Sequence, residues 1–202
     1  MVEQQLGARG IHDQRVLDAM LEVPRHEFVP SEFQAQAYAD HPLPIGAEQT
    51  ISQPFIIAVA LQALALAGSE SVLEVGTGSG YQTALLARMA RQVYSVERHV
   101  ELIEKAQATL QQQGFGNIKI SLRDGSRGWP DYAPFDAILV SAAAPSLPRS
   151  LVEQLGEGGR MVIPVGPPHA QELQLISRQA TQITTETVEG CRFVPLVGLE
   201  GY

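Results

Sequence analysis

Apolar residues along the chain follow the periods of both strands and helices. Short runs rich in branched side chains predict strands at 71–75, 92–97, 117–123, 135–140 and 160–165. Helical spacing between these runs predicts helices at 83–89, 100–112 and 147–155. Strands that alternate with helices favour an α/β fold with a doubly wound, mostly parallel sheet.

The two ends of the chain depart from this alternation. A helix predicted at 11–23 ends before Pro24, and its apolar face comprises Val16, Leu17, Met20 and Leu21. A second, strongly apolar helix is predicted at 55–67. Near the C-terminus, alternating and Thr-rich runs predict antiparallel strands at 172–177 and 182–188, with a last strand segment at 192–196. We therefore expect one domain with a helical cap (1–45), an α/β core (46–166) and a β-rich tail (167–202).

A glycine loop follows the first strand of the expected core. Gly76, Gly78 and Gly80 allow unusual backbone angles and let the main chain approach a ligand, although a tight strand-to-helix turn would use the same residues. The dinucleotide fingerprint G-x-G-x-x-G would place a glycine where this chain has Tyr81. The loop therefore favours a mononucleoside ligand without a pyrophosphate.

Three carboxylates lie at strand ends, where an α/β sheet binds its ligands. Glu97 follows the loop by about 20 residues, a spacing typical of an acid that accepts both ribose hydroxyls, with a solvated strand-end acid as the alternative. Asp124 and Gly125 end the next strand and could line an adenine or form only a turn. Glu74 could lie near a cationic amino group of the ligand or organise the N–H groups of the loop.

Charge and composition narrow the classes of partner. The net charge of −8 and the pI near 5.1 argue against binding nucleic acid through its phosphates. No apolar run reaches the roughly 20 residues of a membrane span, and residues 1–5 lack the features of a signal peptide. Cys191 is the single cysteine, and the five histidines lack metal-ligand spacing. These features predict a cytoplasmic protein without a metal site.

Several motifs together resemble one enzyme family. They are the hexapeptide Gln49–Pro54, the loop Leu73–Tyr81, and the segments 142–145, 158–166 and 193–196, with further similarity in 23–30 and 38–45. This set resembles the bacterial protein-L-isoaspartate O-methyltransferases, which have a Rossmann-like fold and use S-adenosylmethionine. The resemblance implies methylation of the free α-carboxylate of L-isoaspartyl residues in damaged proteins and peptides, whose ester then closes to a succinimide. It implies isoaspartyl proteins as partners, and we expect a monomer.

The resemblance also assigns roles to residues of this sequence. Ser52 is the expected active-site residue, where it would orient the substrate carboxylate; its alternative role, shared with Thr50, is to cap the helix that begins near Pro54. The expected cofactor-binding residues are Gln49, Thr50, Glu74, Gly76, Thr77, Gly78, Ser79, Gly80, Glu97, Asp124 and Gly125.

Two residues depart from the family pattern, which usually has glycine at both positions. Glu48 could repel a carboxylate substrate or point to water, and Arg123 could offset its charge. Three rival functions remain: a methyltransferase for small molecules or RNA, a binding module without turnover, and a nicotinamide dehydrogenase. The hexapeptide disfavours the first, and Tyr81 disfavours the last. Glu48 is the only support for the second.

Overall fold

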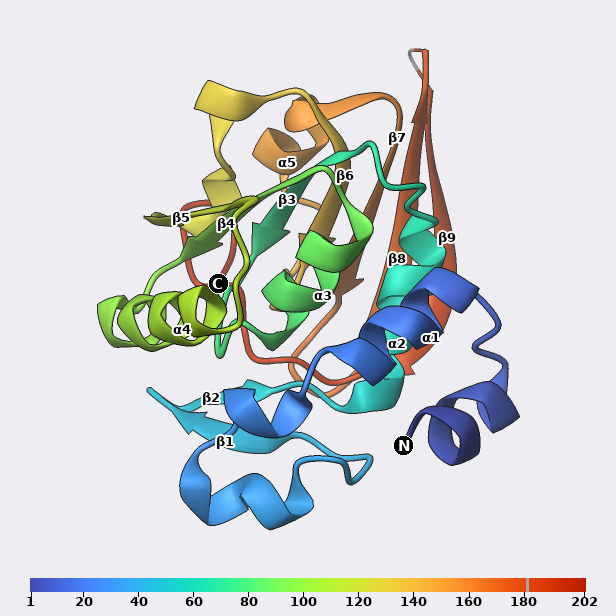
Figure 1. Cartoon of the computed structure of the whole chain (residues 1–202). Coiled ribbons are helices and arrows are strands. Elements are labelled where there is room, and N and C mark those ends of the chain that lie inside the picture. Colours follow the sequence, from blue (N-terminus) through green and yellow to red (C-terminus); the bar gives the residue numbers. More distant parts are fainter. Residues whose placement is uncertain (181) are drawn as a thin grey trace.

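The computed structural model describes residues 1–180 and 182–202 and contains a central seven-stranded sheet (Figure 1). Its strands lie in the order β5-β4-β3-β6-β7-β8-β9. Their bounds are β3 Ser71–Val75, β4 Gln92–Glu97, β5 Ile118–Leu122, β6 Phe135–Val140, β7 Leu155–Val165, β8 Gln171–Gln179 and β9 Gln182–Cys191.

The direction of the strands confirms the predicted fold class. Strands β3 to β7 pair in parallel, whereas β8 and β9 add antiparallel pairs at one edge. The chain runs outward from β3 through β4 to β5 and then returns to β6 beside β3. Such a reversal opens a crevice at the carboxyl ends of the two central strands. The fold is therefore a Rossmann-like, mostly parallel sheet with a crevice beside β3 and β6.

Two apolar layers cover the two faces of the sheet. Alternate residues of one strand enter different layers, because successive side chains of a strand point to opposite faces. Val72 belongs to the first layer and its neighbour Leu73 to the second; Leu139 and Val140 divide in the same way. All four side chains are buried. The central strands therefore read as continuous apolar runs because both of their faces are covered.

Helices α1 to α4 contribute to the first layer and α5 to the second. Figure 1 shows α1, α2 and the N-terminal segment on the same side of the molecule. The bounds are α1 Gln14–Glu22, α2 Pro54–Leu64, α3 Tyr81–Met89, α4 Val100–Gln112 and α5 Arg149–Gln154. Short helical turns are Val2–Leu6, Gly7–Arg9, Arg25–Phe28, Ser31–Gln36, Gly125–Arg127 and Pro130–Tyr132.

Two expectations for the ends of the chain were wrong, and one pair of strands was not expected. Leu21, predicted on the apolar face of α1, is 65% exposed, and the buried face is instead formed by Val16, Ala19 and Met20. Residues 192–196 form no strand; a single bridge joins Pro195 to Ala143. The hairpin of β1 (Leu43–Gly46) and β2 (Gln49–Ile51) was not predicted, and it crosses the expected cap boundary at residue 45.

Candidate functional site

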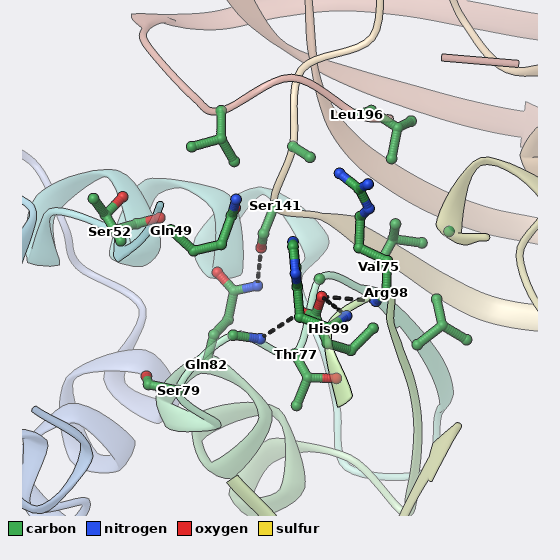
Figure 2. A pocket seen from close by; sticks show the side chains of 18 of the residues that line it. Gln49, Ser52, Val75, Thr77, Ser79, Gln82, Arg98, His99, Ser141 and Leu196 are labelled. Carbon is green, nitrogen blue, oxygen red and sulfur yellow. Dashed lines mark hydrogen bonds between the residues drawn. The ribbon is translucent and has the colours of Figure 1, made fainter. Parts of the chain in front are cut away.

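A pocket lies at the carboxyl ends of β3, β4 and β6, where the strand order reverses. We call it the switch-point pocket. Figure 2 shows Ser52 and Gln49 on one side of it, and Arg98 and His99 on the other. Its lining contains most of the residues predicted from sequence: Gln49, Thr50, Ser52, Gly76, Thr77, Gly78, Ser79, Glu97 and Gly125. Glu74, Gly80 and Asp124 are not among the residues that line it.

The glycine loop has the conformation that its composition predicts. Gly76, Gly78 and Gly80 have φ angles of 96°, 55° and 88°, in the left-handed region that other residues rarely adopt. Gly80 also packs closely, since a Cβ there would lie 3.2 Å from the Cβ of Ala106. Gly80 thus fixes the start of α3, while Gly76 and Gly78 present bare backbone to the pocket.

Three backbone hydrogen bonds hold the Glu97 side chain at the carboxyl end of β4. One carboxylate oxygen accepts the N–H of Gly78 at 3.0 Å, and the other accepts the N–H groups of Arg98 at 2.7 Å and His99 at 3.0 Å. The side chain is only 6% exposed, so it is not a solvated strand-end acid. A carboxylate oxygen can accept two hydrogen bonds, so Oε2, which accepts only that of Gly78 among the described residues, retains capacity for a ligand hydroxyl.

Glu74 lies behind the pocket in a buried network of side chains. Its carboxylate accepts hydrogen bonds from Ser95 and Thr83, both at 2.6 Å, and from Gln82 at 3.3 Å. Because Ser95 donates to Glu74, the 2.6 Å contact between Ser95 and Thr77 must be donated by Thr77. Burial raises the pKa of Glu74 to about 7, although the three hydrogen bonds oppose that shift. Glu74 thus supports the glycine loop through the side chains of Ser95 and Thr77, and not by accepting the backbone N–H groups of the loop.

Asp124 shapes a turn and anchors the C-terminal tail. One oxygen accepts the N–H and hydroxyl of Ser126 at 3.0 and 2.7 Å, and the other accepts the N–H of Leu199 at 2.9 Å. Burial raises the pKa of Asp124, but these hydrogen bonds outweigh burial and hold the pKa below its ordinary value. Gly125 beside it has no room for a side chain, because a Cβ would lie 2.5 Å from Val75.

The segment 49–54 is anchored from the N-terminal cap. Helix α2 has no cap from Ser52 or Thr50: its N-cap residue is Gln53, and the N–H of Phe55 donates instead to Asp40 at 3.1 Å. Asp40 also accepts the side-chain amide of Gln53 at 2.8 Å. Ser52 enters the hydrogen-bond network of the described residues through its carbonyl alone, which leaves its hydroxyl available to a ligand.

A second depression, the outer groove, adjoins the pocket. It runs between the cap, the start of α2, the connection from β7 to β8, the end of β9 and the segment 193–195, and it includes Ile56, His169, Arg192 and Phe193. Both depressions are lined by Thr50, Ser52, Ser141, Val194 and Pro195. Ser52 therefore lies where the two meet.

The two departures from the family pattern occupy different environments. Glu48 is exposed in the β1–β2 turn with a φ of 57°, and it lines neither the pocket nor the groove. Arg123 does line the pocket; its guanidinium donates to Asp131 at 2.8 Å and lies 4.9 Å from the ring centre of Trp129. The extra carboxylate thus points to water, and Arg123 is paired with another acid.

Sequence reasoning missed several lining residues. Gln82 donates to Ser141 at 2.5 Å across the floor of the pocket, as Figure 2 shows. His99, expected in an ordinary packing or surface role, lines the pocket with a buried Nε2 that has no hydrogen-bond partner among the described residues. Ser141 and His99 follow the ends of β6 and β4, and this position could have marked them as residues of the pocket. Nothing in the sequence marked Gln82, which faces the pocket from inside α3.

Other kinds of site have no support in residues 1–180 and 182–202. No group of three or more His, Cys, Asp or Glu side chains there could hold a metal ion. No helix in the same residues is long and apolar enough to cross a membrane.

Comparison with known proteins gives one consistent result. Residues 1–201 match the family model described as protein-L-isoaspartate(D-aspartate) O-methyltransferase. A protein-L-isoaspartate O-methyltransferase of Syntrophobacter fumaroxidans is 54% identical over all of this chain and 94% of its own length. One from Methanoculleus marisnigri is 48% identical over all of this chain and 92% of its own.

Solved structures agree with the sequence relatives. One of a protein-L-isoaspartate O-methyltransferase superposes with a TM-score of 0.88 at 29% identity, covering all of this chain and 67% of its own. A second, a putative enzyme of that name from Plasmodium falciparum in complex with S-adenosyl-L-homocysteine, has a TM-score of 0.82 at 28% identity. That match covers 96% of this chain and 95% of the other.

Proposed function

We propose how the residues of this chain carry out the reaction of the protein-L-isoaspartate(D-aspartate) O-methyltransferase family, to which the chain belongs. The enzyme transfers a methyl group from S-adenosylmethionine to the free α-carboxylate of L-isoaspartyl residues in proteins and peptides, which starts their repair. The observation that carries the residue assignment is the position of Ser52. It lies where the pocket meets the groove, and no group among residues 1–180 and 182–202 uses its hydroxyl.

The switch-point pocket fits an adenosine-type cofactor. Gly76 and Gly78 admit a ligand close to the backbone, and Oε2 of Glu97 has capacity for a ribose hydroxyl. The unpartnered Nε2 of His99 offers one more polar contact on the same side. S-adenosylmethionine supplies the activated methyl group when bound. We assign its contacts to the predicted residues that line the pocket, with Glu74, Gly80 and Asp124 supporting them from behind.

The substrate carboxylate needs orientation more than activation. An α-carboxyl group has an ordinary pKa of about 3.5, so it is ionised at neutral pH and requires no general base. Ser52 donates one hydrogen bond to this carboxylate and aims its oxygen into the pocket. Apolar side chains at the rim, including Ile57 and Leu196, exclude water and strengthen the attraction between opposite charges. Ser52 is not a nucleophile, because an acyl-enzyme serine needs a base in reach.

Substitution of Ser52 tests this assignment. Ser52→Ala is expected to lower kcat/KM for an isoaspartyl peptide by about tenfold to a hundredfold, the effect of losing a hydrogen bond to a charged group. The affinity for S-adenosyl-L-homocysteine and the melting temperature stay unchanged, since the hydroxyl caps no helix. Full activity in the variant would refute the role of Ser52.

The reaction itself is tested with two peptides that differ only in one residue. Labelled S-adenosylmethionine is expected to give a base-labile methyl ester on a peptide with L-isoaspartate and none on the same peptide with L-aspartate. Transfer to both peptides, or to neither while the cofactor binds, would contradict the proposed substrate.

The setting of the enzyme is the remaining part of the proposal. We infer a single methyltransferase domain that acts as a cytoplasmic monomer without nucleic-acid partners. The net charge of −8 supports the last point, and the single cysteine supports a reducing compartment. Light scattering at two protein concentrations is expected to give the mass of one 21.8 kDa chain at both.

A further inference from the structure

Arg25 is the most unusual charged residue outside the site. Its side chain is completely buried, and among the described residues no salt bridge includes it. Burial lowers its pKa to about 10, although the nearby Tyr81 counteracts part of that effect. Burying a charge without an ionic partner costs free energy. The contacts that the guanidinium does make therefore indicate why the charge is kept there.

Those contacts join three segments that are distant in sequence. Nε donates to the carbonyl of Ala37 at 2.7 Å, and Nη2 donates to the carbonyl of Ser52 at 2.8 Å. The guanidinium carbon lies 4.9 Å from the ring centre of Tyr81, the first residue of the helix after the glycine loop. Arg25 thus joins the cap to the active-site segment through two directional hydrogen bonds, and its guanidinium contacts the start of α3 through the ring of Tyr81.

The bond to Ser52 constrains the residue that the proposed reaction depends on. Asp40 holds the next residues, Gln53 and Phe55, but Ser52 itself has no other hydrogen bond within the described chain. The direction of a short side chain follows its own backbone, because Ser has a single rotatable bond to its hydroxyl oxygen. Holding the Ser52 carbonyl therefore restricts where its hydroxyl can point.

We propose that Arg25 is a positioning residue, which aims the Ser52 hydroxyl at the substrate carboxylate by fixing the Ser52 carbonyl. This inference rests on the proposed role of Ser52. It assigns to Arg25 a task that a neutral apolar side chain of similar length cannot perform. It also gives a physical reason for keeping a full charge in the apolar layer.

A double-mutant cycle tests the proposal. Arg25→Met is expected to reduce kcat/KM for an isoaspartyl peptide by about tenfold, with a change of less than about threefold in the affinity for S-adenosyl-L-homocysteine. In the Ser52→Ala background, the same substitution is expected to reduce kcat/KM by less than about threefold, because the hydroxyl that it misdirects is absent. An equal loss in both backgrounds would overturn the proposal.

Two further variants separate positioning from general stability. Arg25→Lys keeps the charge and a single donor nitrogen in place of the fork, so it is expected to recover part of the activity, and it is the variant to use if Arg25→Met does not fold. Arg178→Met is the matched control: Arg178 also donates to a backbone carbonyl, that of Leu155 at 2.7 Å, but it lines neither the pocket nor the groove. It is expected to lower the melting temperature without changing kcat/KM.

The outcomes distinguish this inference from the proposed function. If wild-type enzyme methylates isoaspartyl peptide but Arg25→Met and Arg25→Lys retain full kcat/KM, the reaction stands and the positioning role fails. If Ser52→Ala is itself fully active, the proposed role of Ser52 is refuted, and so is the positioning role of Arg25 that depends on it. Loss of cofactor affinity in Arg25→Met, to the same extent as activity, would assign Arg25 to the loop through Tyr81 instead.

Discussion

The role open to each polar residue of this site depends on which of its polar atoms have no hydrogen bond within the described residues. Ser52 uses its carbonyl and leaves its hydroxyl open, whereas Asp124 uses both carboxylate oxygens within the protein. The position of Asp124 in the sequence is compatible with either a turn or an adenine contact. The hydrogen bonds describe the turn, and an adenine contact through the side chain itself would have to share an oxygen with Ser126 or Leu199. The neighbouring Gly125 lines the pocket and offers backbone there.

The buried carboxyl of Glu74 gives a pH dependence at the residue scale. Its pKa is raised from 4.5 to about 7 by burial, so the folded state binds the proton more tightly than the unfolded chain. Its contribution to stability is therefore full below pH 4.5 and is lost as the pH rises toward 7. We expect the free energy of unfolding to fall by up to about 3 kcal/mol across that interval because of this group.

Urea denaturation of wild type and Glu74→Gln at several pH values between 4.5 and 8 measures this effect. The amide does not ionise, so the difference in unfolding free energy between the two proteins should change with pH and level off above about pH 7. A difference that is constant with pH would show that Glu74 does not titrate in this range. The carboxyls of Glu70, Asp124 and Glu200 have lowered pKa values and so titrate below the interval.

At the scale of elements, the start of α2 depends on a residue outside the helix. Asp40 accepts the N–H of Phe55 and the amide of Gln53, and it pairs with Arg9 at 2.5 Å. A cap supplied from a distant segment cannot be read from the residues before the helix. The β1–β2 hairpin, which lies between Asp40 and α2, was also hidden from sequence reading. Its two turn residues, Ala47 and Glu48, have positive φ, a conformation that glycine usually signals.

Asp40→Ala is expected to lower the free energy of unfolding by about 1–2 kcal/mol, the usual effect of a lost helix cap. It should also reduce methyl transfer, because Gln53 and the preceding Ser52 lose an anchor. Asp13→Ala is the matched control, since Asp13 caps α1 by accepting the N–H groups of Arg15 and Val16 away from the pocket. The control should lose similar stability in urea denaturation but keep its activity; loss of activity in both would point to a general effect.

At the scale of the whole molecule, the pocket is closed by segments from both ends of the chain. The N-terminal hairpin provides Gln49 and Thr50, and the tail provides Leu196 and Val197. The tail is tied down where Leu199 donates to Asp124, and a Cβ on Gly198 would lie 2.0 Å from the same carboxylate. The hairpin and the tail are therefore part of the switch-point pocket.

Asp124→Ala is expected to release the tail and so to lower the affinity for S-adenosyl-L-homocysteine by about tenfold. Calorimetry measures the affinity, and limited proteolysis without ligand reports faster cleavage near the C-terminus. Asp136→Ala is the control, because Asp136 accepts the N–H of Ser71 at the opposite end of β3. Weaker binding without faster cleavage would indicate instead that Asp124 contacts the cofactor directly.

The sequence alone determined the order of strands and helices in the α/β core, the glycine loop and the acid at the end of β4. These features depend on local periodicity and on backbone angles that few residues other than glycine adopt. Both β4 and α4 had the expected bounds, because the apolar period of each element is clear in the sequence. The motifs at 49–54 and 73–81 then indicated the family.

Only the tertiary structure decided what each polar group contacts. Ser52 meets Arg25 across 27 residues of sequence, and Leu199 meets Asp124 across 75. Such pairs form because packing of the two apolar layers brings distant segments together, and no local pattern records the partner. The same limit explains why Leu21 was placed inside and Gln82 was missed: a periodic pattern gives a face of the helix, but the fold decides what that face meets.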